Sequence, residues 1–260
     1  MRFRGRWLGR RIPPWRRRAY VLATLLVVLP LLASAAQMMA SGRPHWSNAS
    51  HATSGQAPAA ATTPEAVLQV YAARTWGLRG ALASHSWITS KRRGAAHYRR
   101  YEVIGWRAFR GRPPLRVKRG IPDGEWFSNV PLKLVDLRGP GVEELIDKVE
   151  TAVRDYPHAA DYSTWPGPNS NTFTAYIGRQ VPELGLDLPP TAIGKDYLPH
   201  GAVFGRPPSG RGFQVSLFGV AGILVGLEEG IEVNLFGLVV GLDFNPPALK
   251  LPGLGRLGWD

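Results

Sequence analysis

An uncharged, apolar run near the N-terminus limits the architecture of this chain more than any other feature. No charged residue occurs from Ala19 to Ala40, and residues 20–36 are almost wholly apolar. This length falls at the short end of what crosses the hydrocarbon core of a bilayer. Eight arginines precede the run within the first eighteen residues. The positive-inside rule therefore predicts a cytoplasmic basic arm over residues 1–18, a transmembrane segment over 19–40, and export of the remainder.

A cleaved signal peptide is the alternative interpretation of the same run. Ala33-Ser34-Ala35 resembles the small-residue pattern of a cleavage site, and the paired arginines could belong to a twin-arginine signal. The run is long for the apolar region of a signal peptide, which favours an uncleaved anchor. Both interpretations send the rest of the chain across the membrane.

The net charge of +13 is concentrated at the N-terminus, where residues 1–43 hold nine arginines and no acidic residue. The remaining 23 Lys and Arg nearly balance the 19 Asp and Glu, so the charge does not indicate a nucleic-acid partner. Cysteine is absent, which excludes a disulfide, a thiolate metal site and a cysteine nucleophile.

The chain beyond the apolar run divides into a spacer and one globular domain. Residues 41–62 are rich in Ala, Ser, Gly, Thr and Pro without periodicity, which predicts a flexible spacer. The domain then covers residues 63–260. Thr63, Pro64 and Glu65 have the order of a helix start, which predicts a helix to about Arg74. A second helix is expected over residues 141–156, and a third with Asn169 or Ser170 as its N-cap.

Two strands are predicted at residues 80–89 and 98–109, joined by the basic connection 91–96. Eleven basic residues and a single acid, Glu102, lie between Lys91 and Arg119, whereas residues 120–260 carry ten basic and seventeen acidic residues. A basic face that includes Arg99 and Arg100 could bind anionic lipid or an anionic polymer. A solvated strand face explains the same charges equally well.

A short repeat marks the C-terminal part of the chain. The segment 215–220, Val-Ser-Leu-Phe-Gly-Val, recurs eighteen residues later as Val-Asn-Leu-Phe-Gly-Leu. The polar break Glu228-Glu229-Gly230 separates the copies. We expect a glycine-rich apolar hairpin over residues 213–244, resting on the domain or on the bilayer surface, with a re-entrant membrane segment as the alternative.

No phosphate-binding loop, metal-binding helix pair or serine-hydrolase elbow is present. The six histidines are scattered singly. A metal site from His85, His97 and Glu102 is one option, but neighbouring strands produce many such coincidences. We therefore expect neither a metal nor a cofactor.

Four segments resemble a bacterial family of proteins of unknown function, domain-of-unknown-function family 3750. They are residues 71–77, 101–106, 165–173 and 181–197. The similarity extends from about residue 64 to the C-terminus. It implies a protein of the cell envelope and no particular activity.

A more distant resemblance is to circularly permuted papain-like proteins, of the NlpC type and the lecithin retinol acyltransferase type. Those proteins place a histidine on an early strand, a polar residue on the next strand and a cysteine at a helix N-terminus, in an Asn-Cys-x-x-Phe setting. The resemblance implies Ser170 as nucleophile, His85 as base and Glu102 as the orienting group, with Asn169, Asn171 and Trp165 around them. Serine in place of cysteine is a departure, because a hydroxyl is far less acidic than a thiol and needs a well-aligned base. Ser170 could equally serve only as a helix cap.

The sequence thus predicts an α+β fold, a small antiparallel sheet with packed helices, permuted papain-like and preceded by one transmembrane helix. Two functions remain open for a single-pass protein of the bacterial inner membrane with a periplasmic or otherwise extracytoplasmic domain. The first is a serine-type hydrolase or acyltransferase that acts on an amide or ester of peptidoglycan, a lipid or a lipoprotein. The second is a non-catalytic module that binds anionic lipid or an anionic cell-wall polymer.

Overall fold

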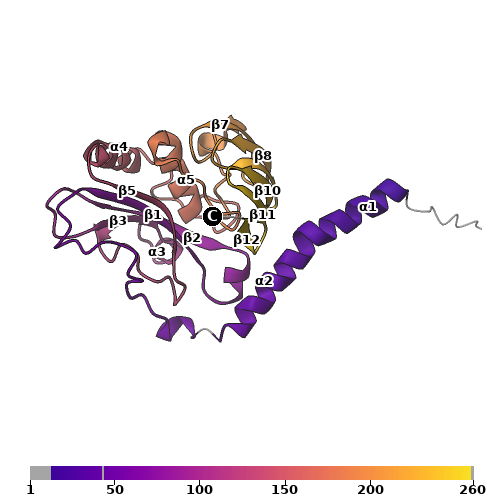
Figure 1. Ribbon diagram of the computed structural model, residues 1–260, viewed down its shortest axis with the longest axis horizontal. Coiled ribbons are helices and arrows are strands. Elements are labelled where there is room, and N and C mark those ends of the chain that lie inside the picture. Colours follow the sequence, from indigo (N-terminus) through magenta and orange to yellow (C-terminus); the bar gives the residue numbers. More distant parts are fainter. Residues whose placement is uncertain (1–12, 43, 259–260) are drawn as a thin grey trace, which may run out of the picture.

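A computed structural model describes residues 13–42 and 44–258, and Figure 1 shows two antiparallel sheets beside a long N-terminal helix. The α+β class is confirmed. The predicted basic arm falls mostly on residues 1–12, outside the described residues. The apolar run forms one continuous helix, Pro14–Ala40, which is long and apolar enough to cross a membrane. It consists of α1 (Pro14–Ala23), a π-helical stretch (Thr24–Val28) and α2 (Leu29–Ala40).

The first sheet has five strands in the order β4-β3-β2-β1-β5, and every neighbouring pair is antiparallel. The helix α3 (Gly105–Ala108) follows β3, and a 3-10 turn at Gly77–Ala81 joins β1 to β2. The strands are β1 (Val67–Arg74), β2 (Ser84–Lys91), β3 (Arg99–Val103), β4 (Leu115–Arg119) and β5 (Leu132–Arg138).

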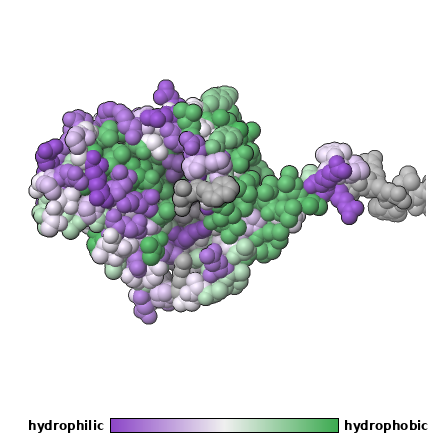
Figure 2. Space-filling view, viewed as in Figure 1, coloured by the Kyte–Doolittle hydropathy of each residue, from purple (hydrophilic) through white to green (hydrophobic). Residues whose placement is uncertain are grey.

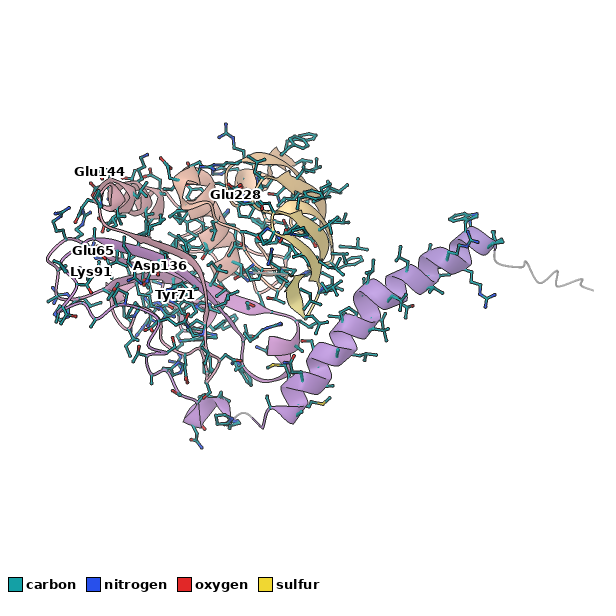
Figure 3. All side chains as sticks on the ribbon, in the orientation of Figure 1. Glu65, Tyr71, Lys91, Asp136, Glu144 and Glu228 are labelled. Carbon is teal, nitrogen blue, oxygen red and sulfur yellow. The ribbon has the colours of Figure 1, made fainter. Side chains whose placement is uncertain are left out.

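The helix predicted to start at Thr63 is wrong, because residues 67–74 form the strand β1 inside this sheet. β1 pairs with β2 on one side and β5 on the other, and seven of its eight residues are buried. A strand covered on both faces has a continuous apolar run, which periodicity alone does not separate from a buried helix. Residues 63–65 precede the strand, and Lys91 donates to the carbonyl oxygens of Thr63 and Glu65 (Figure 3).

Two helices cover one face of the five-stranded sheet. They are α4 (Val142–Arg154) and α5 (Ser170–Gln180), close to the predicted bounds. The main hydrophobic core lies between these helices and the sheet. Fully buried members of this core include Ile146 and Val149 of α4, Phe173 and Ile177 of α5, and Ile88 of β2. A smaller aromatic cluster around Trp87 occupies the opposite face.

The second sheet has seven strands in the order β12-β11-β10-β9-β8-β7-β6, joined in sequence as an up-and-down meander. The predicted hairpin at residues 213–244 is the centre of this sheet. Short 3-10 turns at Trp46–Asn48, Pro182–Leu184 and Pro199–Gly201 lie outside both sheets. The strands are β6 (Phe204–Gly205), β7 (Gly212–Leu217), β8 (Ala221–Gly226), β9 (Gly230–Leu235), β10 (Leu238–Phe244), β11 (Pro247–Leu251) and β12 (Gly255–Gly258).

Candidate functional site

The structure brings together two of the three residues that the sequence predicts as catalytic, His85 and Glu102. Nε2 of His85 on β2 lies 3.5 Å from Oε2 of Glu102 on β3. Both side chains are buried on the face of the sheet opposite α5. The ring of His85 stacks on Trp126, with ring centroids 3.7 Å apart and an interplanar angle of 15°. This indole covers one face of the imidazole.

Glu102 is held by two guanidinium groups. Nε of Arg100 donates to Oε2 at 2.9 Å, and Arg116 donates to Oε1 from the neighbouring strand β4. Burial alone would raise the pKa of Glu102, but the hydrogen bond from His85 and the charges of Arg100 and Arg116 outweigh it and hold the pKa well below its ordinary value. Burial lowers the pKa of His85, against the opposing effect of Glu102, so the ring is neutral at pH 7.

A cleft of about 370 Å³ opens beside this cluster. Its aromatic wall continues the stack of His85 and Trp126 outward to Trp106, whose ring lies 5.5 Å from that of Trp126. Trp106 is 41% exposed, whereas Trp126 is buried. We call this feature the Trp106 cleft. It is lined by His51, Arg100, Glu102, Trp106, Arg116, Lys118, Gly120, Ile121, Glu125 and Trp126.

Cationic side chains are in the majority among the residues that line the Trp106 cleft. The guanidinium groups of Arg100 and Arg116 share the carboxylate of Glu102, and the buried carboxylate of Asp123 also acts on Arg100. Lys118 lies directly opposite Arg100 in the β3–β4 register, so its side chain leaves the same face of the sheet. Glu125 supplies the opposing charge at the rim. The cleft thus combines an exposed indole with three cationic side chains.

The segment predicted as a flexible spacer contributes to one wall of this cleft. Residues 53–57 lie along the loop that contains Asp123, whose carboxylate accepts hydrogen bonds from the hydroxyl of Thr53 and the backbone N–H groups of Gln56 and Ala57. His51 precedes these contacts and packs edge-on against Phe127. Sequence reasoning missed His51, Trp106, Lys118 and Trp126, because no local motif connects residues so far apart in the chain.

Ser170, the third predicted catalytic residue, is the first residue of α5. Side chains of a strand alternate between its two faces. Ser86 points toward α5 and bonds with Asn171 and Thr174, so the adjacent His85 leaves β2 on the other face. Within the described part of the chain, the Ser170 hydroxyl forms no hydrogen bond with His85 or Glu102.

The residues predicted to surround Ser170 are engaged in contacts within the fold. Asn169 is the N-cap of α5, with a reciprocal capping box formed with Thr172, and its amide also donates to the carbonyl oxygens of Thr164 and Ile193. Asn171 donates to the carbonyl oxygens of Ser84 and Ile193. Trp165 is half-exposed, and its Nε1 donates to the carbonyl oxygen of Phe236.

Arg99 and Arg100, predicted to share one basic face, lie on opposite faces of β3. Arg99 pairs with Glu150 of α4 at 3.0 Å, while Arg100 is buried against Glu102. Arg92 also pairs with three acids of α4, Glu143, Asp147 and Glu150. Acidic side chains of the same domain therefore neutralise part of the segment from Lys91 to Arg119.

Comparison with known proteins gives a match to one family model, over part of the chain. The chain matches no curated protein and no solved structure. The family described as protein of unknown function (DUF3750) matches residues 65–197, which include the five-stranded sheet, α4 and α5. The match ends before the seven-stranded sheet. The chain belongs to the DUF3750 family.

Proposed function

We propose that this protein is a single-pass, membrane-anchored module of the bacterial cell envelope that binds an acidic cell-wall glycan in the Trp106 cleft. The observation that carries the proposal is the exposed indole of Trp106 next to a base where two guanidinium groups share one carboxylate. An indole face contacts the apolar face of a sugar ring, and cationic side chains bind its acidic groups.

The preference for a glycan over a lipid headgroup follows from the position of the cleft. The cleft opens on the face of the five-stranded sheet opposite α4 and α5. In Figure 1, β3 and α3 lie on the side of the domain away from α1. We therefore favour a ligand that is not part of the bilayer, such as a glycan, over a lipid headgroup.

The test is sedimentation of the full-length, detergent-solubilised protein with isolated cell-wall sacculi. Lys118→Glu should weaken binding by roughly tenfold or more, because a hydrogen bond to a charged group contributes about 1.5–3 kcal/mol and 1.4 kcal/mol is a factor of ten. Trp106→Ala should weaken it as well. Arg100 is unsuitable for charge reversal, since a second acid beside the buried Glu102 would disrupt the fold.

Arg119→Glu is the matched control. Arg119 follows Lys118 on the same exposed strand, and its register partner is Arg99, so its side chain leaves the other face. The proposal expects Arg119→Glu to retain most of the binding. Equal losses for Lys118→Glu and Arg119→Glu would show nonspecific attraction to the basic segment and would contradict binding in the cleft.

A second candidate function is a serine-type hydrolase or acyltransferase on a permuted papain-like fold. One contact favours it, the approach of His85 to Glu102 at 3.5 Å, since an acid beside a histidine orients a general base. The mechanism further requires the hydroxyl of Ser170 to reach an imidazole that Trp126 now covers on one face.

Labelling with a fluorophosphonate probe distinguishes this candidate from the binding module. A hydrolase would be labelled, and Ser170→Ala would abolish the labelling. Thr174→Ala is a suitable control, because Thr174 lies one helical turn further along α5 and bonds back to the carbonyl oxygen of Ser170. Absence of labelling in the wild-type protein, or labelling that survives in Ser170→Ala, would exclude Ser170 as nucleophile.

A further inference from the structure

The seven-stranded sheet turns its apolar residues outward and its polar residues inward. β9 shows the pattern clearly, since Glu232 and Asn234 are buried while Ile231, Val233 and Leu235 are exposed. A sheet with one face in water has the opposite distribution, with its apolar residues toward the core. The outer face therefore does not have the character of a water-exposed surface.

Apolar side chains form continuous rows across this outer face. One row runs across six neighbouring strands, and each residue in it is the register partner of the next. Within β7 to β12, the positions that share the face of this row carry no Asp, Glu, Lys or Arg. Figure 3 shows the side chains projecting outward from these strands, and large apolar patches of this kind mark interaction surfaces. The row consists of Phe213, Val225, Ile231, Leu242, Leu249 and Leu257.

The inner face of the same sheet holds a buried network of charges. Lys250 lies within 3.0 Å of Glu232, Asp187 and Asp243, and Lys195 pairs with Glu232. The ammonium groups outweigh the effect of burial and hold the pKa of Glu232 below its ordinary value. The charged side chains of the sheet thus lie on its inner face, as is required when the outer face contacts hydrocarbon.

One stripe of α2 packs against both sheets, at the 3-10 turn between β1 and β2 and at the turn between β11 and β12. Ser34 Oγ lies 2.8 Å from the carbonyl oxygen of Ala81 in the first turn and 2.9 Å from that of Gly253 in the second. Leu31 and Met38, one turn to either side, approach Gly253 and Gly80. Figure 2 shows hydrophobic surface on the side of the domain next to the helix and along the helix itself.

The length of the helix places these contacts at the depth of the bilayer. The uncharged part, Ala19 to Ala40, is about 33 Å long, close to the roughly 30 Å of a hydrocarbon core. The residues before α2 supply only about 15 Å of it. A spanning helix must therefore include α2, which brings the β11–β12 turn and the adjoining sheet to the membrane.

We infer that the outer face of β7–β12 lies against the lipid of the same bilayer that the N-terminal helix crosses. The inference rests on the membrane anchoring in the proposed function and adds a second membrane contact. The sheet has open edges at β6 and β12, and open edges do not occur inside hydrocarbon. The sheet accordingly lies face-down at the interface, at the depth of about 5–10 Å that interfacial helices reach.

Two turn residues at one end of the sheet support the same placement. Phe218 and Phe236 have φ angles of +53° and +56° and are 57% and 63% exposed. Turns of this kind favour Asn, Asp or Gly. Bulky residues at positive φ are uncommon, and such strain concentrates at functional positions. An aromatic ring at a membrane interface explains why phenylalanine occupies both turns.

Site-directed spin labelling tests the inference, because the chain has no cysteine and each label is unique. Val233→Cys places the label at the centre of the outer face, and Ile223→Cys, its register partner, provides a second position. Val130→Cys, which is exposed in the loop before β5, is the control. Each full-length variant is reconstituted in phosphatidylethanolamine and phosphatidylglycerol vesicles and floated on a density gradient.

The readout is the ratio of label accessibility to oxygen and to a water-soluble nickel chelate. At Val233 and Ile223 the ratio should exceed that at Val130 by about tenfold, because the acyl region admits oxygen and excludes the chelate. A ratio equal to that at Val130 would overturn the inference. Exclusion of both reagents would also overturn it, since a second copy or a partner protein would then cover the face. Failure to float would contradict the anchoring itself.

Discussion

At the scale of single residues, Glu102 connects the core to the Trp106 cleft. It is fully buried, and it accepts hydrogen bonds from Arg100 and Arg116 while contacting His85. Removal of its charge would leave two guanidinium groups beside each other in a poorly solvated place. The carboxylate of Glu102 therefore holds two of the cationic side chains of the cleft in place, without any need to contact a ligand itself.

We predict that Glu102→Gln lowers the free energy of unfolding by about 3–5 kcal/mol, the cost of removing one partner from a buried ion pair. Urea denaturation followed by circular dichroism measures the change. Glu144→Gln, an exposed change in the first turn of α4, should cost only a few tenths of a kcal/mol. Similar costs for the two variants would show that Glu102 is not the structural anchor of this cluster.

Stability should also depend on pH through His85. Burial lowers its pKa below the ordinary value of 6.5. As the pH falls through 6.5, the unfolded chain binds a proton at this position and the folded chain does not, so the free energy of unfolding decreases. Glu102 adds a further decrease below pH 4.5, where the unfolded chain protonates it first.

The variant His85→Gln isolates the histidine contribution. Its free energy of unfolding, measured by urea denaturation at intervals between pH 7 and pH 5, should change less over this range than that of the wild-type protein. An unchanged slope would mean that His85 binds its proton equally well in the folded and unfolded chain, contrary to its burial beneath Trp126.

At the scale of secondary-structure elements, two turns of the seven-stranded sheet have an exposed phenylalanine with a strained backbone. These residues are Phe218 and Phe236. The two copies of the repeat place Phe-Gly at equivalent turns, and Ser216 and Asn234 accept hydrogen bonds from Gly219 and Gly237. The side chain of Asn234 also donates to Asp196 beneath the sheet. The repeated segment therefore builds two similar turns on the same support.

Replacement of the strained residue should stabilise the domain in detergent. Phe236→Asn is expected to raise the free energy of unfolding by about 1 kcal/mol, because Asn tolerates positive φ better than Phe does. Phe213→Asn removes an equally exposed ring from a strand position without positive φ, so no such gain is expected there. Urea denaturation of both variants checks the difference, and a loss of stability in Phe236→Asn would contradict the assignment of strain.

Several elements were predictable from the sequence. The amphipathic α4 and the N-cap of α5 agree with their patterns. β2 overlaps the predicted strand 80–89, and β3 covers the first part of the predicted strand 98–109, whose later residues form α3. β1 was mistaken for a helix because a helix-like start at residues 63–65 precedes its apolar run, and the run itself does not separate a buried strand from a buried helix. The outward apolar face of the last sheet was not predictable in detail, since the sequence alternation of β9 is the same whichever face meets the core.

The candidate site was predictable only in part, for a related reason. His85 and Glu102 lie on adjacent strands, and the strand prediction brought them together. Trp106 and Trp126 join them from α3 and from a loop outside both sheets. Contacts between such distant segments depend on the path of the chain and have no local signal.

At the scale of the whole molecule, the domain has two different surfaces. One is the apolar outer face of β7–β12, which we propose lies against the membrane that the N-terminal helix crosses. The other is the Trp106 cleft, on the face of the five-stranded sheet opposite α4 and α5, which we propose binds cell-wall material.

The most direct test of this arrangement is the accessibility of a single cysteine in spheroplasts. Arg112→Cys places a thiol in the exposed loop between α3 and β4. A membrane-impermeant maleimide should label it in intact spheroplasts as fully as after lysis. Labelling only after lysis would place the domain in the cytoplasm and would contradict both the envelope function and the glycan ligand.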